Sequence, residues 1–439
     1  MRSADNFDSP GASGSSRLSG LQITTFLLCA FVAMIDGFDT QAIALSAPQI
    51  AGTWLVEPAM FGGVFASGLL GALVGALVFG VAADRLGRKP GLLVAILLFS
   101  LVSLVTPYTH TLTELTIVRF ITGIGLGGAL PGVIAVTSEY SPAHRRATIV
   151  SLMFCGFPLG AVAGGLAAAI LIPTHGWPIL FYIGGIVPLL LLPAIAFFVP
   201  ESVRFLALRG RHEEAGKILR RMNGLEDWDR EAPGAAADAG SIGALFRGGR
   251  ALGTAILSVT FLLSLMLAYF LVNWLPLLAQ QAGVGMKNAV LGVAALNLGA
   301  IFGCLIIGRL ADRQGPALPI GCAYAAGGAA IAMIGQSAES GALLLTLCFV
   351  AGALSIGAQM CVVALGAIFY DTAVRATGVG WLLGTGRIGA IIGPILGGVL
   401  IARGVPASSL FVIAGGISLL AALGAFAMGW FVLRPAAAR

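Results

Sequence analysis

Four charged residues lie inside long apolar stretches of this sequence: Asp36, Asp39, Arg119 and Arg387. A charged side chain at the centre of a membrane-spanning helix costs about 2.5 to 3.5 kcal/mol on insertion scales, so each requires a partner or a water-filled cavity. Counting about 1.5 Å per residue along each stretch puts Asp36 and Arg119 at the same depth. Asp39 follows three residues later, on the same face of the predicted helix.

A carboxylate beside a guanidinium is suited to taking up and releasing a proton, because the cation favours the charged acid whereas burial favours the neutral one. Asp36, Asp39 and Arg119 are therefore candidate proton-coupling residues. The alternative is a permanent salt bridge between two helices, but such a pair is costly inside a membrane and needs only one of the two acids.

Arg387 lies near the middle of its apolar stretch, and no acid in the second half of the sequence is placed to neutralise it. Asp312 and Asp371 belong to one edge of the predicted bundle and Glu339 to the other. An unpaired guanidinium invites an anion, and its planar fork fits a carboxylate in a bidentate contact. Arg387 is therefore the candidate ligand of a substrate carboxylate. The alternative is a guanidinium bonded to backbone carbonyls.

Other polar and aromatic residues in the second half of the sequence are candidates for contacts with a substrate ring or its hydroxyl groups. For an aromatic residue near the end of a span, the alternative is a place in the interfacial belt of a membrane protein. The candidates are Tyr269, Asn273, Trp274, Asn297 and Gln359.

The composition requires a membrane around these residues. Of the 439 residues, 58% are apolar and 10% are charged, and the mean hydropathy is +0.97, which excludes a water-soluble globule and a nucleic-acid-binding protein. Apolar stretches separated by Pro, Gly and charged clusters predict twelve membrane spans. They are expected at 22–45, 59–83, 90–108, 112–138, 146–172, 178–199, 254–280, 287–311, 316–335, 341–368, 376–402 and 408–433.

The positive charges indicate how these spans are oriented. With the N-terminus in the cytosol, 21 of the 25 Lys and Arg residues fall on the cytosolic side, and only Lys287 and Arg403 fall outside. Short cytosolic loops carry the excess of positive charge in membrane proteins. We therefore expect both termini to be cytosolic.

An internal repeat predicts two parallel halves. The segment Gly80–Lys89 after the second span recurs as Gly308–Gly315 after the eighth, and Arg146-Ala-Thr148 recurs as Arg375-Ala-Thr377 at nearly the same offset. The predicted fold is an all-α membrane protein with 12 transmembrane helices in two parallel-repeat six-helix bundles. The expected domains are an N-tail (1–21), a first bundle (22–199), a cytosolic linker with an amphipathic helix (200–252), a second bundle (253–433) and a C-tail (434–439).

The repeated loop is a candidate gate at the cytosolic side. Its glycines permit a sharp turn and its acid can pair with a neighbouring helix end, although the charges could also serve only to set the topology. The second copy lacks the Arg-Lys pair of the first. The candidate gating residues are Gly80, Asp84, Arg85, Gly87 and Arg88, then Asp312 and Arg313 in the second copy, with Glu139 and Glu201 in the same network.

Catalytic and metal sites are not indicated. All four histidines fall in predicted loops, and the six cysteines lie inside apolar stretches with no CxxC pair, so we expect neither an enzyme nor a metal site. No GxxxxGK[ST] phosphate-binding loop is present. The expected energy source is an ion gradient, with a proton as the coupling ion and no other cofactor.

Several segments resemble a known family. Gly80–Lys89 resembles the loop signature of the major facilitator superfamily, and Arg119-xxx-Gly123-x-Gly125-x-Gly127 resembles its fourth-helix motif in proton-coupled members. Asp36-Gly37-Phe38-Asp39, with Arg375–Trp381 and Gly386–Gly389, is similar to the aromatic acid:proton symporter family, and the likeness extends from about 20 to 433. The resemblance implies import of a small aromatic carboxylate with a proton by alternating access, with both acids of the first span involved. Benzoate-, hydroxybenzoate- and gallate-type acids are all compatible.

The alternative function is a sugar, polyol or other organic-ion porter of the same superfamily. The segment Pro200–Leu206 resembles a motif shared by sugar porters and organic-ion transporters. Arg387 disfavours this alternative, because a neutral sugar does not need a cation in mid-membrane. We expect a multi-pass protein of a cell membrane, a bacterial inner membrane in particular, that works as a monomer.

Overall fold

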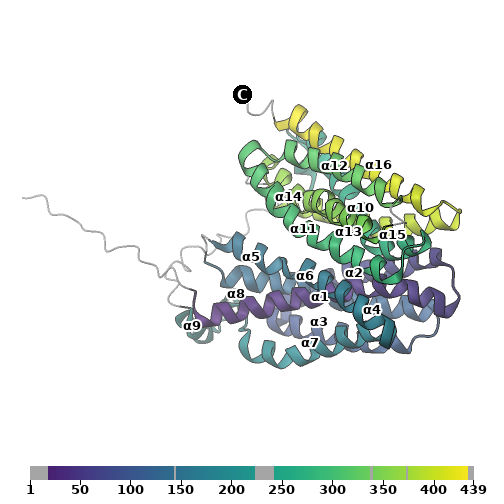
Figure 1. The fold of residues 1–439 in the computed structure, drawn as a ribbon. Coiled ribbons are helices and arrows are strands. Elements are labelled where there is room, and N and C mark those ends of the chain that lie inside the picture. Colours follow the sequence, from purple (N-terminus) through teal and green to yellow (C-terminus); the bar gives the residue numbers. More distant parts are fainter. Residues whose placement is uncertain (1–17, 143–144, 223–241, 337–339, 372–373, 434–439) are drawn as a thin grey trace, which may run out of the picture.

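The computed structural model describes residues 18–142, 145–222, 242–336, 340–371 and 374–433 (Figure 1). The side chains of Asp84, Ala147, Ala376 and 431–433 lie outside this description. So do nearly all of the expected N-tail and the whole of the expected C-tail.

Helices make up the described chain, and no strand occurs in it. Twelve of the helical segments are long and apolar enough to cross a membrane, and each coincides with one predicted span. The first six spans are formed by α1 (Gly20–Trp54), α2 (Phe61–Leu86), α3 (Arg88–Val105), α4 (Leu112–Tyr140), α5 (Arg146–Phe154) with α6 (Gly156–His175), and α7 (Pro178–Phe198). The other six are α10 (Ala251–Gln281), α11 (Met286–Gln314), α12 (Ala317–Ile334), α13 (Gly341–Ala351) with α14 (Gly357–Phe369), α15 (Arg375–Ala402) and α16 (Ala407–Ala427).

Helix α1 begins at a capping box and is longer than predicted. The backbone N–H of Gln22 donates to Ser19 Oγ, and the backbone N–H of Ser19 donates to Gln22 Oε1 at 2.9 Å, which satisfies donors at the helix start. The sequence predicted an end at residue 45, yet the helix continues through Pro48 to Trp54. A proline inside a membrane helix is tolerated because neighbouring helices satisfy the freed backbone groups.

Two short helices follow the first bundle. They are α8 (Val203–Leu208) and α9 (His212–Arg221). Their apolar residues, Val203, Leu206 and Ala215, pack into the core of the first bundle, whereas the charged residues of α9 face outward. The described part of the predicted linker therefore lies against the first bundle.

The two bundles lie side by side, with α1–α7 forming one and α10–α16 the other (Figure 1). Within the bundles, α2 packs on α4 and α10 packs on α15. Three helix pairs join the bundles: α2 with α15, α6 with α11, and α1 with α10. We call the end that holds Arg85, Arg88, Arg250 and Arg375 the basic end, and the opposite end the far end.

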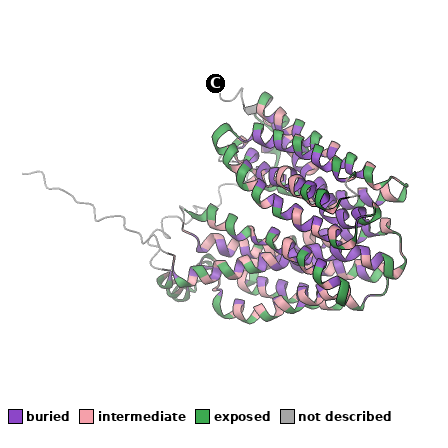
Figure 2. Cartoon of the chain, viewed as in Figure 1, coloured by how far each residue is buried: buried purple, intermediate pink, exposed green. Residues whose placement is uncertain are grey.

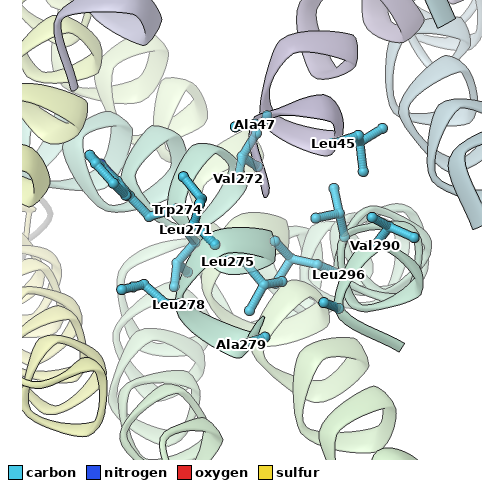
Figure 3. Close-up of a cluster of buried hydrophobic side chains, with 14 of the residues drawn as sticks. Leu45, Ala47, Leu271, Val272, Trp274, Leu275, Leu278, Ala279, Val290 and Leu296 are labelled. Carbon is cyan, nitrogen blue, oxygen red and sulfur yellow. The ribbon is translucent and has the colours of Figure 1, made fainter. Parts of the chain in front are cut away.

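Buried apolar side chains form three clusters, and Figure 2 marks the buried residues along the helices in purple. One, the shared cluster, combines residues of both bundles towards the far end, and Figure 3 shows Ala47 of α1 beside Val272 of α10 within it. The other two belong to one bundle each, around Phe99 in the first and Tyr324 in the second. The bundles thus share a core at the far end and keep separate cores towards the basic end.

Small residues allow the bundles to approach closely at the far end. A Cβ atom on Gly398 of α15 would lie 2.7 Å from the carbonyl oxygen of Ala59, and one on Gly165 of α6 would lie 2.8 Å from the Cβ of Ala294. Trp274 of α10 stands edge-on to Phe65 of α2, with ring centroids 5.3 Å apart. We call these contacts the far-end seal. They hold the structure closed at this end.

Candidate functional site

Asp39 of α1 is paired within the first bundle. Its Oδ2 lies 3.1 Å from Arg119 Nη1, and its Oδ1 accepts a 2.6 Å hydrogen bond from Ser103 Oγ. Arg119 also donates to the backbone carbonyl of Asp39 at 3.2 Å and lies over the Phe181 ring, with Cζ 5.7 Å from the ring centroid. Asp39 and Arg119 are both buried, so the pair is a desolvated ion pair with additional hydrogen bonds.

Counting residues along the spans placed Arg119 level with Asp36, whereas its ionic partner is Asp39, about one helical turn further along α1. Side chains in a helix lean towards the helix N-terminus. The N-terminus of α4 is at the far end, so the Arg119 side chain reaches towards that end and meets Asp39, which lies one turn beyond Asp36 on α1. The count placed Cα atoms and ignored this reach.

Asp36 has a different environment. It is 2% exposed, and its Oδ1 accepts one hydrogen bond, from Thr40 Oγ1 at 3.2 Å. Its Oδ2 is buried and has no hydrogen-bond partner. Besides Asp39, its charged neighbour is Arg387 of α15, in the other bundle.

Arg387 is partly buried, and it forms no hydrogen bond or salt bridge with any residue that the structure describes. It interacts electrostatically with Asp36, and Tyr269 of α10 interacts with both. Among the described residues of the second bundle, no acid forms an ion pair with Arg387, and Glu339 lies outside the described residues. Asp36 was not identified from the sequence as a neighbour of Arg387, because Arg387 was compared only with acids in the second half of the sequence.

The other predicted contact residues are spread over three helices of the second bundle. On α10, Asn273 Nδ2 donates to the backbone carbonyl of Tyr269 at 2.7 Å. On α11, Asn297 Nδ2 donates to the carbonyl of Val293 at 2.9 Å. Both asparagines are 5% exposed. Gln359 is partly buried on α14.

Trp274 requires a correction. Its side chain is fully buried in the shared cluster, and its Nε1 donates to the carbonyl of Pro394 at 3.0 Å. With its polar atom satisfied and its ring edge-on to Phe65, Trp274 is part of the far-end seal in this conformation and leaves no surface for a ligand. Its neighbour Asn273 carries the polar group on this part of α10.

The first candidate gating loop joins a network at the basic end. Gly87 connects α2 and α3 with a φ of 107°, which a glycine adopts without strain. Arg88 forms a 2.6 Å salt bridge with Glu139 of α4. Glu201 Oε1 accepts the backbone N–H groups of Arg88 and Lys89 at 2.9 and 3.1 Å, so it caps the N-terminus of α3.

Other parts of this loop contribute through the backbone or lie apart. The carbonyl of Arg85 accepts a hydrogen bond from Arg209, Gly80 has open space around its Cα, and the side chain of Asp84 lies outside the described residues. Tyr140 OH donates to the carbonyl of Glu201 at 2.8 Å, a contact that sequence reasoning did not find.

The second copy of the loop is not in a matching network. Asp312 and Arg313 are exposed at the end of α11, and neither forms a hydrogen bond or salt bridge within the described chain. Instead, Arg250 at the start of α10 lies 2.9 Å from Asp371. This pair was not predicted, because its residues belong to the linker and to a loop without a repeated motif.

Comparison with known proteins agrees with this architecture. The model of the Major Facilitator Superfamily matches residues 29–382. The chain belongs to the major facilitator superfamily. It is therefore a multi-pass membrane transporter and not an enzyme.

Two relatives within the superfamily have similar sequences. The 4-hydroxybenzoate transporter PcaK of Pseudomonas putida is 37% identical over 401 residues, 88% of each chain. A gallate transporter of Pseudomonas putida is 35% identical over 429 residues, 95% of this chain and 94% of the relative. These relatives confirm the predicted resemblance to the aromatic acid transporters.

A solved structure supports the fold. The xylose transporter XylE from Escherichia coli in an inward-open conformation superposes with a TM-score of 0.71, covering 92% of this chain and 95% of XylE at 20% identity. The likeness confirms the arrangement of twelve helices in two bundles.

Proposed function

We propose that this protein is a secondary transporter that imports a small aromatic carboxylate together with a proton. The observation that carries the proposal is the placement of Asp36 and Arg387 on opposite bundles as electrostatic neighbours. Neither has an ionic partner within its own bundle among the described residues. The names of the two relatives, which are transporters of 4-hydroxybenzoate and gallate, support the class of substrate.

Asp36 and the substrate carboxylate compete for the positive charge of Arg387, and this competition would couple the uptake of the proton to that of the aromatic acid. In the empty site, Arg387 stabilises the buried carboxylate of Asp36. An aromatic carboxylate that binds Arg387 takes over this positive charge. Asp36, with one oxygen unpartnered, then binds a proton, because an isolated buried carboxylate is far less stable than the neutral acid. The charge of the site is the same before and after, and one proton enters with each carboxylate.

Asp39 has a supporting role in this scheme. Its ion pair with Arg119 and its hydrogen bond from Ser103 leave it fully bonded. We assign it to holding α1 against α3 and α4, so that Asp36 is presented to the second bundle.

The basis of alternating access in this proposal is the difference between the two ends, which is a shared cluster at the far end and two separate cores towards the basic end. The separate cores at the basic end allow the bundles to part there, while the far-end seal stays closed. We place the basic end and both chain termini in the cytosol on the positive-inside rule, so that the far-end seal closes the site to the outside. In the reverse movement, the network of Arg88, Glu139 and Glu201 and the loops of Asp84 and Asp312 would form the gate at the basic end.

The proposal also covers the oligomeric state, the membrane and the energy source. The transporter works as a monomer in a bacterial inner membrane, because each chain contains both bundles and hence a whole site. It uses the proton gradient and no bound cofactor. A sugar or polyol porter is the weaker candidate, because a neutral ligand would not use the positive charge of Arg387 near Asp36.

Transport in proteoliposomes tests the proposal. Wild-type protein should accumulate labelled 4-hydroxybenzoate when the lumen is alkaline, and Asp36→Asn should abolish this uphill uptake while retaining counterflow exchange. Glu213→Gln, which changes an exposed acid of α9 outside the proposed site and gate, is the matched control and should accumulate substrate. Full uphill uptake by Asp36→Asn would exclude Asp36 as the proton site, and transport of xylose but of no aromatic acid would refute the substrate class.

A further inference from the structure

Asn273 presents a hydrogen-bond acceptor that nothing in the described chain uses. Its Nδ2 donates to the carbonyl of Tyr269. Because a carbonyl oxygen can only accept, the amide orientation is fixed with the NH₂ group towards the helix. Oδ1 therefore points away from the Tyr269 carbonyl, and it accepts no hydrogen bond from any described residue.

The surroundings of this oxygen are open on one side. The Asn273 residue is 5% exposed, yet its Oδ1 is not one of the buried polar atoms that are sealed from solvent without a partner, as Gln41 Oε1 and Ser46 Oγ are. A small accessible surface thus remains at Oδ1. An acceptor in this position is suited to a ligand that brings a donor.

The position of Asn273 relates this acceptor to the proposed anion site. Asn273 lies four residues after Tyr269 on α10, and residues four apart share a helix face. The hydroxyl group of Tyr269 lies within electrostatic range of Arg387 and Asp36. One helical turn, about 5.4 Å, is comparable to the length of a benzene ring with its two para substituents. A carboxylate at Arg387 therefore directs the opposite edge of the ring along α10 towards Asn273.

We propose that Asn273 accepts a hydrogen bond from a ring hydroxyl of the substrate, so that the transporter selects hydroxylated aromatic acids over the unsubstituted acid. This inference rests on the proposed function and adds the chemical class of the ring substituent. A buried acceptor left without a donor is costly. An unsubstituted ring, which excludes water from Oδ1 and offers no donor, is therefore disfavoured.

The proposal requires a donor, which separates it from a simple preference for polar rings. The hydroxyl of 4-hydroxybenzoate can donate, whereas the ether oxygen of 4-methoxybenzoate can only accept. Two acceptors facing each other repel. The methoxy acid should therefore bind no better than benzoate, although its substituent is also oxygen.

The experiment measures half-saturation concentrations for counterflow of benzoate, 4-hydroxybenzoate and 4-methoxybenzoate in proteoliposomes. Wild-type protein should prefer the hydroxy acid about tenfold or more over the other two. Asn273→Leu, of similar size but without an acceptor, should lose this preference, and its affinity for benzoate should rise, because no buried acceptor is then left without a donor. Thr346→Val is the control, because Thr346 makes the same bond to the carbonyl four residues earlier, at 2.9 Å, on an exposed face of α13.

The outcomes distinguish this inference from the function on which it rests. Equal affinity of the wild type for the hydroxy and methoxy acids would overturn it, and that comparison needs no variant. Loss of benzoate and hydroxybenzoate in equal proportion by Asn273→Leu would also overturn it and leave Asn273 a structural residue. Failure of the wild type to transport any aromatic acid would instead refute the proposed function.

Discussion

The guanidinium of Arg119 binds the carboxylate of Asp39 at 3.1 Å, whereas Asp36, three residues earlier on the same helix, forms no ion pair with a described residue and has Arg387 of the other bundle as its cationic neighbour. The two acids of the Asp-Gly-Phe-Asp segment are therefore not equivalent. Asp39 has an ionic partner and a hydroxyl donor inside the first bundle. Asp36 has a hydrogen bond from a threonine hydroxyl, and its cationic neighbour, Arg387, belongs to the other bundle. The pair at Asp39 stabilises the bundle, and the unpaired carboxylate of Asp36 is available for chemistry.

Removal of one member of the Asp39–Arg119 pair should destabilise the folded protein. Asp39→Asn leaves a buried guanidinium without its counter-ion, a change that costs about 3 to 5 kcal/mol in buried pairs. We expect a clear fall in the thermal unfolding midpoint of the detergent-purified protein. Asp36→Asn should leave the midpoint close to that of the wild type. An equal loss of stability in both variants would contradict the distinction between the two acids.

Arg387 should determine preference for a charged over an uncharged ligand. Arg387→Lys keeps the charge but loses the planar fork, so binding of a benzoate-type acid should weaken by about 1.5 to 3 kcal/mol. Arg387→Gln should bind the acid and its amide equally. Titration calorimetry in detergent with both ligands measures this. If Arg387→Gln still prefers the acid as strongly as the wild type does, the anion binds elsewhere, and Arg119 is then the next candidate.

Glu201 should stabilise the turn between α2 and α3. Its Oε1 accepts three backbone N–H groups, those of Arg88, Lys89 and Ser202, at 2.8 to 3.1 Å. Glu201→Ala leaves these donors without an acceptor and should cost about 1 to 3 kcal/mol. The control is Glu214→Ala, which removes an exposed pair with Arg211 worth at most about 1 kcal/mol. Chemical denaturation in detergent compares the two, and similar losses would exclude a capping role for Glu201.

Gly165 should control closure of the far end. A side chain there collides with Ala294 across the interface between the bundles, so Gly165→Leu should favour conformations that are open at the far end. A cysteine introduced at Val290, which is fully buried, should then react faster with a membrane-impermeant thiol reagent added on that side. Gly63→Leu is the control, because no atom lies near a Cβ at Gly63. Unchanged labelling in Gly165→Leu would show that this contact does not hold the end closed.

The sequence was sufficient for the fold, because a membrane span is a local signal. Twenty consecutive apolar residues need no knowledge of the rest of the chain, and the spans that begin at Leu112 and Gly341 were placed at their first residues. The end of α1 was missed because Pro48 was taken as a stop, although neighbouring helices compensate for a proline in a membrane helix.

The contacts of the site were harder to predict, because they depend on side-chain direction and on the packing of separate bundles. The Arg119 side chain points towards the N-terminus of α4 and therefore contacts Asp39 and not Asp36. A count of residues along each helix gives only the positions of the Cα atoms. The relation between Asp36 and Arg387 spans about 350 residues of sequence and is not implied by either motif alone. Trp274 and Asn273 are adjacent, and only the packing of α10 against α15 shows that Trp274 belongs to the core.

The position of Trp274 has a spectroscopic consequence. Its indole is wholly buried, donates to Pro394 and is edge-on to Phe65 of the other bundle. Fluorescence of an indole in such dry surroundings is emitted at short wavelength and moves to longer wavelength when water reaches the ring. Parting of the bundles at the far end separates Trp274 from Phe65 and wets it. The protein therefore contains an intrinsic fluorophore at the interface that opens in the proposed transport cycle, and a variant that keeps Trp274 alone of the six tryptophans would report this opening as a shift in emission wavelength without any attached dye.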